Sequence, residues 1–194
     1  MLLHNKYYQI LKQYLGDYER GIYGRELVGK IPLSQKAIAL ALQDLAKQSI
    51  LKYTKRGQIK EYKLNLAIPK TKDMIIATEL LQKTEFLEKH QVLTYLFEKE
   101  DDRIIGIFGS YAKGREKKDS DIDIFILGEK KKEDYDSKGA TYRLDVSIKY
   151  FSQEEFERLL REENPLCREM VRYHVLMFGA ERFVHLLKRR VRLL

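Results

Sequence analysis

The sequence predicts an α+β protein built from two domains. In the first third, apolar residues recur at helical spacing and a short hairpin follows. The second half instead contains short apolar runs rich in Ile and Phe, at 104–108 and 120–127, which have the composition of buried strands. A third run, 141–149, alternates polar and apolar residues as a half-buried strand does. Helices flank these runs, so we expect a β-sheet packed with helices.

Helical patterns and breakers give the expected organisation along the chain. Ile68-Pro69 marks a boundary. We expect a first domain at residues 1–68, a connecting helix at 69–83 and a second domain at 84–194, which opens with a helix of its own. Ser152 is expected to cap a helix, and a last helix is expected from about Leu166 to Arg190.

The first domain is expected to hold three short helices and a hairpin. The helices are predicted at His4–Leu15, at Gly24–Lys30 and from Gln35 to about Gln48. Ser34 is a good N-cap for the third helix. The hairpin spans residues 50–64, with its turn around a glycine.

Charge is distributed unevenly. The formal net charge is +8, and residues 1–67, with twelve Lys or Arg and five Asp or Glu, supply +7 of it. This asymmetry favours a polyanionic partner for the first domain, although a solvated basic face is the alternative.

The single Cys167 fits a reducing cytoplasm. The N-terminus lacks the pattern of a signal peptide, and no apolar run approaches 18 residues, so no membrane segment is expected.

Two carboxylates interrupt the second apolar run. Asp121 and Asp123 are two residues apart, so on a strand they point to the same face. At about 7 Å and an effective dielectric near 20, their repulsion is on the order of 2 kcal/mol. Oxygen ligands at this spacing suit Mg²⁺, or a pair of ions about 3.5–4 Å apart. Gly109-Ser110 follows the preceding strand and would open a short helix, which makes an anion site. A metal-bound nucleoside triphosphate satisfies both features.

These residues carry a resemblance to a known family. Gly109-Ser110, ten further residues and Asp121-x-Asp123 resemble the signature of the DNA polymerase β-like nucleotidyltransferases, in particular their minimal branch. The resemblance covers about the C-terminal half. It implies a mixed β-sheet, a Gly-Ser turn that holds the triphosphate and paired aspartates that bind two Mg²⁺ ions. It also implies a third acid on a later strand, which Asp145 matches; the alternative is an exposed Asp on an edge strand.

The resemblance also implies an activity. Such an enzyme transfers a nucleoside monophosphate, AMP in many minimal members, from a triphosphate to an acceptor hydroxyl. Lys113 or Arg115, in the basic loop beside the Gly-Ser turn, would neutralise phosphate charge, although a solvated loop is the alternative for most of these residues.

The first domain resembles a winged helix-turn-helix. This resemblance places the third helix in the major groove of double-stranded DNA and the hairpin on phosphates. The residues expected to contact DNA are Gln35, Lys36, Gln43 and Lys47 on the helix and Lys52, Lys55, Arg56 and Lys60 on the hairpin. The alternative is a winged helix used for dimerisation or protein docking.

Several functions remain open at this level. Minimal nucleotidyltransferases are often paired with a partner toxin that they modify, and a homodimer would suit paired half-sites on DNA. The alternative is a transcriptional regulator whose nucleotidyltransferase domain only binds or senses a nucleotide. Both roles can coexist in an antitoxin that represses its own operon. A template-free polymerase or an RNA-modifying enzyme is a third interpretation.

Overall fold

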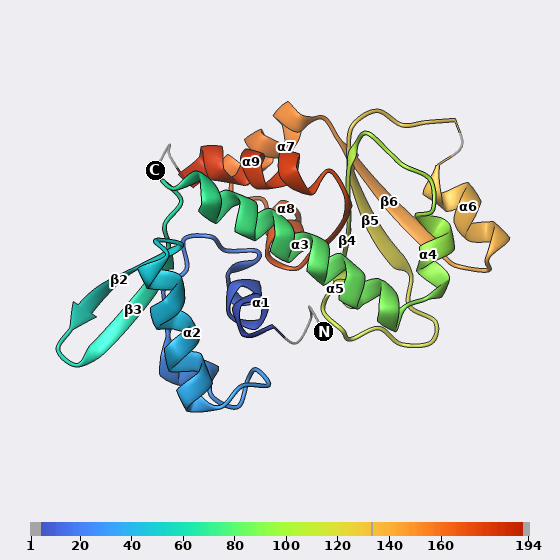
Figure 1. Cartoon of the computed structure of the whole chain (residues 1–194). Coiled ribbons are helices and arrows are strands. Elements are labelled where there is room, and N and C mark those ends of the chain that lie inside the picture. Colours follow the sequence, from blue (N-terminus) through green and yellow to red (C-terminus); the bar gives the residue numbers. More distant parts are fainter. Residues whose placement is uncertain (1–4, 133, 192–194) are drawn as a thin grey trace. The chain divides into compact units, whose positions relative to one another are not determined.

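The computed structural model describes residues 5–132 and 134–191, without the side chains of residues 56 and 188–191. Contacts divide the chain into two units: residues 1–81 with 187–194, and residues 82–186 (Figure 1). The three-part organisation expected from the sequence stays a prediction.

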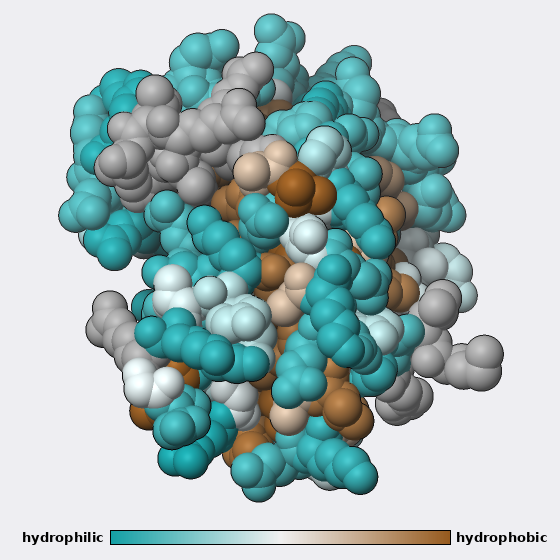
Figure 2. Space-filling view, turned by 60° about the vertical axis from the view of Figure 1, so that its left-hand side comes forward, coloured by the Kyte–Doolittle hydropathy of each residue, from teal (hydrophilic) through white to brown (hydrophobic). Residues whose placement is uncertain are grey.

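No helix among the described residues is long and apolar enough to span a bilayer. The face drawn in Figure 2 is largely hydrophilic, with apolar side chains between polar ones.

The first unit combines helices with a three-stranded antiparallel sheet. Its elements are α1 (Lys6–Leu11), η1 (Lys12–Tyr14), β1 (Ile22–Tyr23), η2 (Gly24–Leu27), α2 (Gln35–Lys47), β2 (Leu51–Arg56) and β3 (Ile59–Leu64). The strands lie in the order β1-β3-β2. Helix α2 begins after Ser34, whose Oγ accepts the N–H of Ala37, so the predicted cap is confirmed. The buried phenol of Tyr14 donates to the Tyr62 carbonyl at 3.0 Å and joins η1 to β3.

Two predicted helices of this unit are shorter than expected. The first α-helix ends at Leu11 and continues only as a 3₁₀ turn to Tyr14, while its expected start at His4 lies outside the described residues. The second is a single 3₁₀ turn, η2, and does not reach Lys30. There the chain leaves the helical region at Val28, a β-branched residue with low helix preference (φ −63°, ψ 125°).

The first of the two helices expected between residues 69 and 99 is longer than predicted. Helix α3 runs without interruption from Pro69 to Lys89, and the short α4 follows at Val92–Leu96. The prediction of an end near Lys83 was wrong because the segment contains no internal Gly or Pro that would end a helix there. Pro69 is tolerated at the first helical position, where its missing N–H would have had no partner.

The second unit is built on a mixed sheet, as the resemblance implied, and this sheet has four strands, one more than the sequence predicted. Its strands are β4 (Ile104–Phe108), β5 (Ile122–Leu127), β6 (Val146–Phe151) and β7 (Val175–Phe178), in the order β6-β5-β4-β7. Strand β4 is antiparallel to β5 and β7, whereas β5 and β6 are parallel. The further helices are α5 (Gly109–Ala112), α6 (Tyr135–Thr141), α7 (Gln153–Arg161), α8 (Pro165–Arg172) and α9 (Ala180–Val191).

Strand β7 corrects the expected long C-terminal helix. Helix α8 ends at Arg172, and the chain then enters the sheet beside β4 before α9 begins. Helical spacing had suggested a continuous apolar stripe through Tyr173 and Met177. Val175-Leu176-Met177-Phe178 is instead a four-residue apolar run, and Gly179 at φ +73° turns the chain out of it. Tyr173, expected in the core, is 40% exposed.

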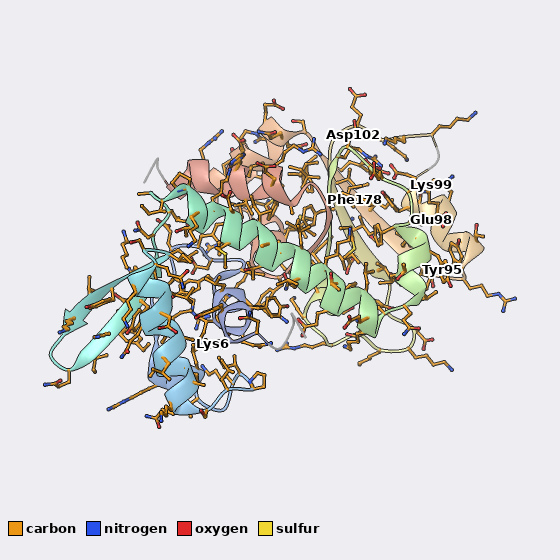
Figure 3. The ribbon with its side chains drawn as sticks, viewed as in Figure 1. Lys6, Tyr95, Glu98, Lys99, Asp102 and Phe178 are labelled. Carbon is orange, nitrogen blue, oxygen red and sulfur yellow. The ribbon has the colours of Figure 1, made fainter. Side chains whose placement is uncertain are left out.

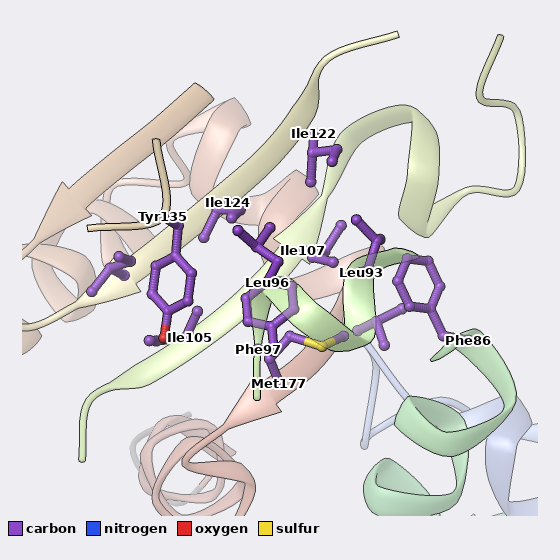
Figure 4. Packing of buried hydrophobic residues seen from close by; sticks show 12 residues of the cluster. Phe86, Leu93, Leu96, Phe97, Ile105, Ile107, Ile122, Ile124, Tyr135 and Met177 are labelled. Carbon is purple, nitrogen blue, oxygen red and sulfur yellow. The ribbon is translucent and has the colours of Figure 1, made fainter. Parts of the chain in front are cut away.

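The two faces of the sheet pack against different sets of helices. Ile105, Ile107, Ile122, Ile124 and Ile126 form one core with apolar side chains of α3, α4 and α6 (Figure 4). On the opposite face, Phe125 packs against Phe156 of α7 and Phe183 of α9. Because side chains alternate along a strand, Asp123 lies on the same face as Phe125.

A cluster of charged residues lies just before β4, where it is far along the strand from Asp123. The guanidinium of Arg103 donates to the carboxylates of Asp101 and Asp134, and the Tyr150 phenol also donates to Asp134 at 2.9 Å. Arg103 and both carboxylates are buried. Asp102 is exposed beside them (Figure 3). Asp101 and Asp102 therefore lie outside the aspartate site, as expected from the sequence.

Candidate active site

A tight turn joins β4 to α5 and carries the Gly-Ser pair. Gly109 is buried and adopts φ +69°, a region that non-glycine residues rarely enter. A Cβ at this position would lie 2.1 Å from Asp123 Oδ2. Glycine is therefore needed here both for the backbone conformation and for the approach of the Asp123 carboxylate.

Sheet register brings Asp123 to this turn. Asp123 is paired with Phe108, the last residue of β4, so its carboxylate lies directly beside Gly109. It is half-buried, whereas Asp121, just before β5, is exposed. Burial raises the pKa of the Asp123 carboxyl, the negative charges of Asp121 and Glu169 raise it further, and Lys149 and Lys113 oppose the shift. The turn thus concentrates negative charge in a partly desolvated place.

The predicted third acid lies one strand further along the sheet. The Ile122 N–H donates to the Asp145 carbonyl at 2.8 Å, and Ile122 pairs with Val146 at the start of β6. This register places Asp145 level with Asp121, and the Asp145 side chain is exposed. Leu144, by contrast, packs against the apolar core that the isoleucines of the sheet form with α3, α4 and α6. The role of Asp145 as third acid stays a prediction.

The predicted phosphate-binding residues occupy the same turn. Ser110 is half-buried in α5, and its carbonyl accepts the Arg115 N–H at 2.9 Å. Lys113 caps the end of α5, and its ammonium lies 2.5 Å from Glu169 Oε1. Arg115 is exposed in the following loop. Ser110 and Lys113 are therefore gathered near Asp123, while the Arg115 side chain is directed to solvent.

Two charged residues near Asp123 were not predicted from the sequence. Glu169 lies on α8. Lys149 lies on β6, where it pairs with Phe125 of β5. Both charges affect the pKa of Asp123. No local pattern marks either residue, because the contact between Lys113 and Glu169 joins positions 56 residues apart. Only the tertiary fold brings α8 to this turn.

The acidic side chains near Gly109 can be compared with the ligands that a metal ion requires. Within residues 5–132 and 134–191, no group of three or more His, Cys, Asp or Glu side chains is close enough together to hold an ion. The chemistry of Asp121 and Asp123 nevertheless suits a hard divalent cation, because both offer carboxylate oxygens. Burial, followed by the negative charges of Asp121 and Glu169, raises the pKa of Asp123, and a bound cation would offset that negative charge. These residues fit Mg²⁺.

Comparison with known proteins agrees with this geometry. Residues 89–178 match the family model described as Nucleotidyltransferase domain. The chain carries a nucleotidyltransferase domain. The matched segment contains all four strands of the mixed sheet, the Gly109 turn and the aspartates. The protein is accordingly a transferase that acts on nucleotides. Searches of curated proteins and of solved structures found no match.

The residues predicted to contact DNA lie in the first unit, which the family match does not include. Those predicted on α2, Gln35, Lys36, Gln43 and Lys47, are all exposed, and the opposite side of that helix is buried. On the hairpin, Lys52 and Lys55 are exposed, and the ammonium of Lys60 lies 4.6 Å from the centre of the Tyr53 ring. The Arg56 side chain lies outside the described part. Both the winged-helix assignment and DNA binding stay predictions.

Proposed function

We propose that the chain transfers a nucleoside monophosphate, with AMP the first to test, from a triphosphate to an acceptor hydroxyl in the cytoplasm. One observation carries this proposal: the Asp123 carboxylate is seated against Gly109, so the metal-binding acid and the Gly-Ser turn face the same point. A triphosphate with its metal ions needs both features at one place.

The residues of the turn have distinct roles in this proposal. Ser110 and the backbone N–H groups after Gly109 orient the β- and γ-phosphates, and Lys113 and Arg115 offset their charge. The acceptor oxygen attacks the α-phosphorus, the bond from that phosphorus to the bridging oxygen breaks, and pyrophosphate leaves. The carboxylate of Asp145 accepts the hydroxyl proton. When bound by Asp121 and Asp123, Mg²⁺ would neutralise charge on the phosphates and the leaving group.

Labelled substrates test this function. Purified protein is incubated with each α-labelled triphosphate and Mg²⁺, alone and with cell extract. We expect label on a discrete protein or RNA, and its loss in Asp121→Asn and Asp123→Asn. Asp102→Asn is the matched control, because Asp102 is an exposed aspartate at the far end of β4. Equal transfer by wild type and by Asp123→Asn would overturn the proposal.

A second function concerns the N-terminal unit. In the β2–β3 hairpin, Lys52 lies directly opposite Lys63, and Lys55 lies directly opposite Lys60. Like charges in such cross-strand pairs destabilise a sheet, so a polyanionic partner would compensate them. We propose that this unit binds double-stranded DNA as a winged helix, in a homodimer that represses transcription. A partner toxin is then a candidate acceptor for the transferase.

The regulator that binds a nucleotide without turnover is the alternative. Its distinguishing result would be a specific operator whose affinity changes with added triphosphate, together with no label transfer under any condition.

A further inference from the structure

Lys113 contacts Glu169 of α8 and Tyr173, the residue that follows this helix. Its ammonium lies 2.5 Å from Glu169 Oε1 and 5.2 Å from the centre of the Tyr173 ring. The side chains of Lys113 and Glu169 are 27% and 37% exposed. An ammonium above an aromatic face gains attraction from the ring, and it gains more when it is partly desolvated. Lys113 therefore has a defined position before any ligand is present.

The surroundings of this pair distinguish it from an ordinary surface ion pair. Arg158 of α7 and Glu162, which follows this helix, also form a pair, but both side chains are more than half exposed, and such pairs contribute little. The charges of Glu169 and Lys113 instead act on the Asp123 carboxyl, where Glu169 raises its pKa and Lys113 lowers it. Lys113 also ends the short helix α5 that Gly109 begins, and Gly109 lies against the Asp123 carboxylate, so the pair lies beside the aspartate site.

A carboxylate at this place has an electrostatic disadvantage. Glu169 adds negative charge beside Asp121 and Asp123, where the proposed substrate is itself an anion. Repulsion by Glu169 alone would weaken triphosphate binding. Its contact with Lys113 gives the carboxylate a compensating role, because a flexible lysine otherwise loses considerable side-chain freedom when it is fixed on a ligand.

We propose that Glu169 is a positioning residue for the triphosphate, which holds the Lys113 ammonium beside Asp123 so that it meets the phosphates already in place. This inference rests on the proposed nucleotidyltransferase function. It assigns to α8 a part in nucleotide binding that the Gly-Ser and Asp-x-Asp pattern does not include. Fixing one long side chain at a binding site is equivalent to about 2- to 12-fold in affinity.

The test measures binding and turnover in Glu169→Gln. With a non-hydrolysable ATP analogue and Mg²⁺, we expect the affinity to fall about 3- to 10-fold, within the range for fixing one side chain. The KM for the triphosphate should rise by a similar factor with kcat nearly unchanged, because the contact with the phosphates is made in the ground state as well. Glu162→Gln removes a paired, exposed carboxylate at the end of α7 and should leave both quantities unchanged.

A double-mutant comparison separates positioning from a general effect. Lys113→Met should weaken analogue binding, and adding Glu169→Gln to it should cause no further loss, because Glu169 acts through Lys113. A further loss in the double variant would overturn the proposal. So would tighter binding by Glu169→Gln alone, which would show that Glu169 only repels the anion.

The same binding assay distinguishes failure of the proposed function from failure of the positioning role alone. If wild-type protein fails to bind any triphosphate with Mg²⁺, the proposed function itself fails. If wild type binds and Glu169→Gln binds equally well, only the positioning role is wrong. Thermal unfolding of each variant, followed by circular dichroism, verifies that the compared proteins are folded.

Discussion

At the scale of single residues, the Gly109–Asp123 contact is the most sensitive point of the site. Gly109→Ala faces both an unfavourable φ of +69° and a Cβ 2.1 Å from Asp123 Oδ2. We expect it to abolish nucleotide transfer and to lower stability by more than the roughly 1–2 kcal/mol of the backbone term alone. The measurements are label transfer from an α-labelled triphosphate and thermal unfolding.

Gly114 offers a matched control for this substitution. It also has a positive φ, +62°, but a Cβ there would have no neighbour within 4 Å. Gly114→Ala should therefore lose stability through its backbone only and leave the Asp123 carboxylate in place. Similar activity in the two alanine variants would contradict the role of the Gly109 contact.

Asp123 is also expected to reduce the stability of the fold. Burial, followed by the charges of Asp121 and Glu169, raises the pKa of its carboxyl. The folded state therefore binds the proton more readily than the unfolded state. The contribution of the protonated carboxyl to the free energy of unfolding is present below about pH 3.9, and it is lost as the pH rises through the raised pKa. At neutral pH, Asp123→Asn should be more stable to urea, by roughly 0.5–2 kcal/mol, while transfer is lost.

Mg²⁺ provides the complementary observation for Asp123. The ion should raise the unfolding temperature of wild type and leave that of Asp123→Asn unchanged, because only the wild-type site gains a ligand. A lower stability of Asp123→Asn in metal-free buffer at pH 7 would refute this interpretation of the crowded carboxylates.

Only some of the residues at the site could be predicted from the sequence. Spacing on one strand suffices to place Asp121 and Asp123 on one face, and Gly109 precedes them at the expected turn. Glu169 could not be found in this way, because its contact with Lys113 depends on how α8 packs on the sheet. Helical periodicity describes which face of a helix is apolar and not which polar residue meets a distant turn.

At the scale of elements, several helices end with a residue in the left-handed region where glycine is usual. Glu163 after α7 has φ +56°, and the Asn164 N–H donates back to the Leu159 carbonyl. Glu163→Gly should therefore increase the free energy of unfolding by about 0.5–1 kcal/mol. Glu162→Gly, one residue earlier at φ −75°, lacks this advantage and should destabilise the protein. Urea unfolding of both variants measures the difference.

The buried charges at the start of β4 predict a dependence on acid. Burial opposes ionisation of Asp134, but the hydrogen bonds from Arg103 and Tyr150 prevail and lower its pKa. A lowered pKa gives stability that is present above about pH 3.9 and is lost as the pH falls through the folded value. Asp134→Asn should lose roughly 3–5 kcal/mol at pH 7, because Arg103 remains buried with one partner fewer.

Urea midpoints measured between pH 7 and pH 3 assess this prediction. The midpoint of wild type should fall more steeply below about pH 4 than that of Asp134→Asn. Parallel curves for the two proteins would show that Asp134 does not carry the acid sensitivity.

Among the elements, long or alternating segments were easier to predict than short ones. The cap at Ser34 led to the right helix. The alternation of Val146 and Ile148 led to strand β6, but this strand begins at Val146 and not at Thr141, which is the last residue of α6. Strand β7 was missed because four apolar residues fit both a helix and a strand, and only pairing with β4 decides between them. Helix α3 was divided wrongly because periodicity alone does not locate an end without Gly or Pro.

At the scale of the whole molecule, the chain combines a basic N-terminal part with a nucleotidyltransferase domain. Lys55→Glu tests whether the basic part binds DNA. It replaces one of two directly opposed lysines with an acid, which should slightly favour the hairpin. Affinity for duplex DNA should nevertheless fall, and the dependence of log affinity on log salt should become shallower by about one phosphate contact.

Lys99→Glu is the matched control for the DNA measurement. It makes the same change of charge at an exposed position of the other unit (Figure 3). Nucleotide transfer should be unaffected by Lys55→Glu. An equal loss of DNA affinity in both variants would point to net charge alone and would contradict a specific role for the hairpin.

The most direct test of the central claim compares two positions of the label on the same triphosphate. With Mg²⁺ and the acceptor, label at the α-phosphate should become covalently attached to the acceptor, whereas label at the γ-phosphate should leave as pyrophosphate. Both signals should disappear in Asp123→Asn and persist in Asp102→Asn. Attachment of the γ-label, or undiminished transfer by Asp123→Asn, would contradict nucleotidyl transfer at the Gly109–Asp123 turn.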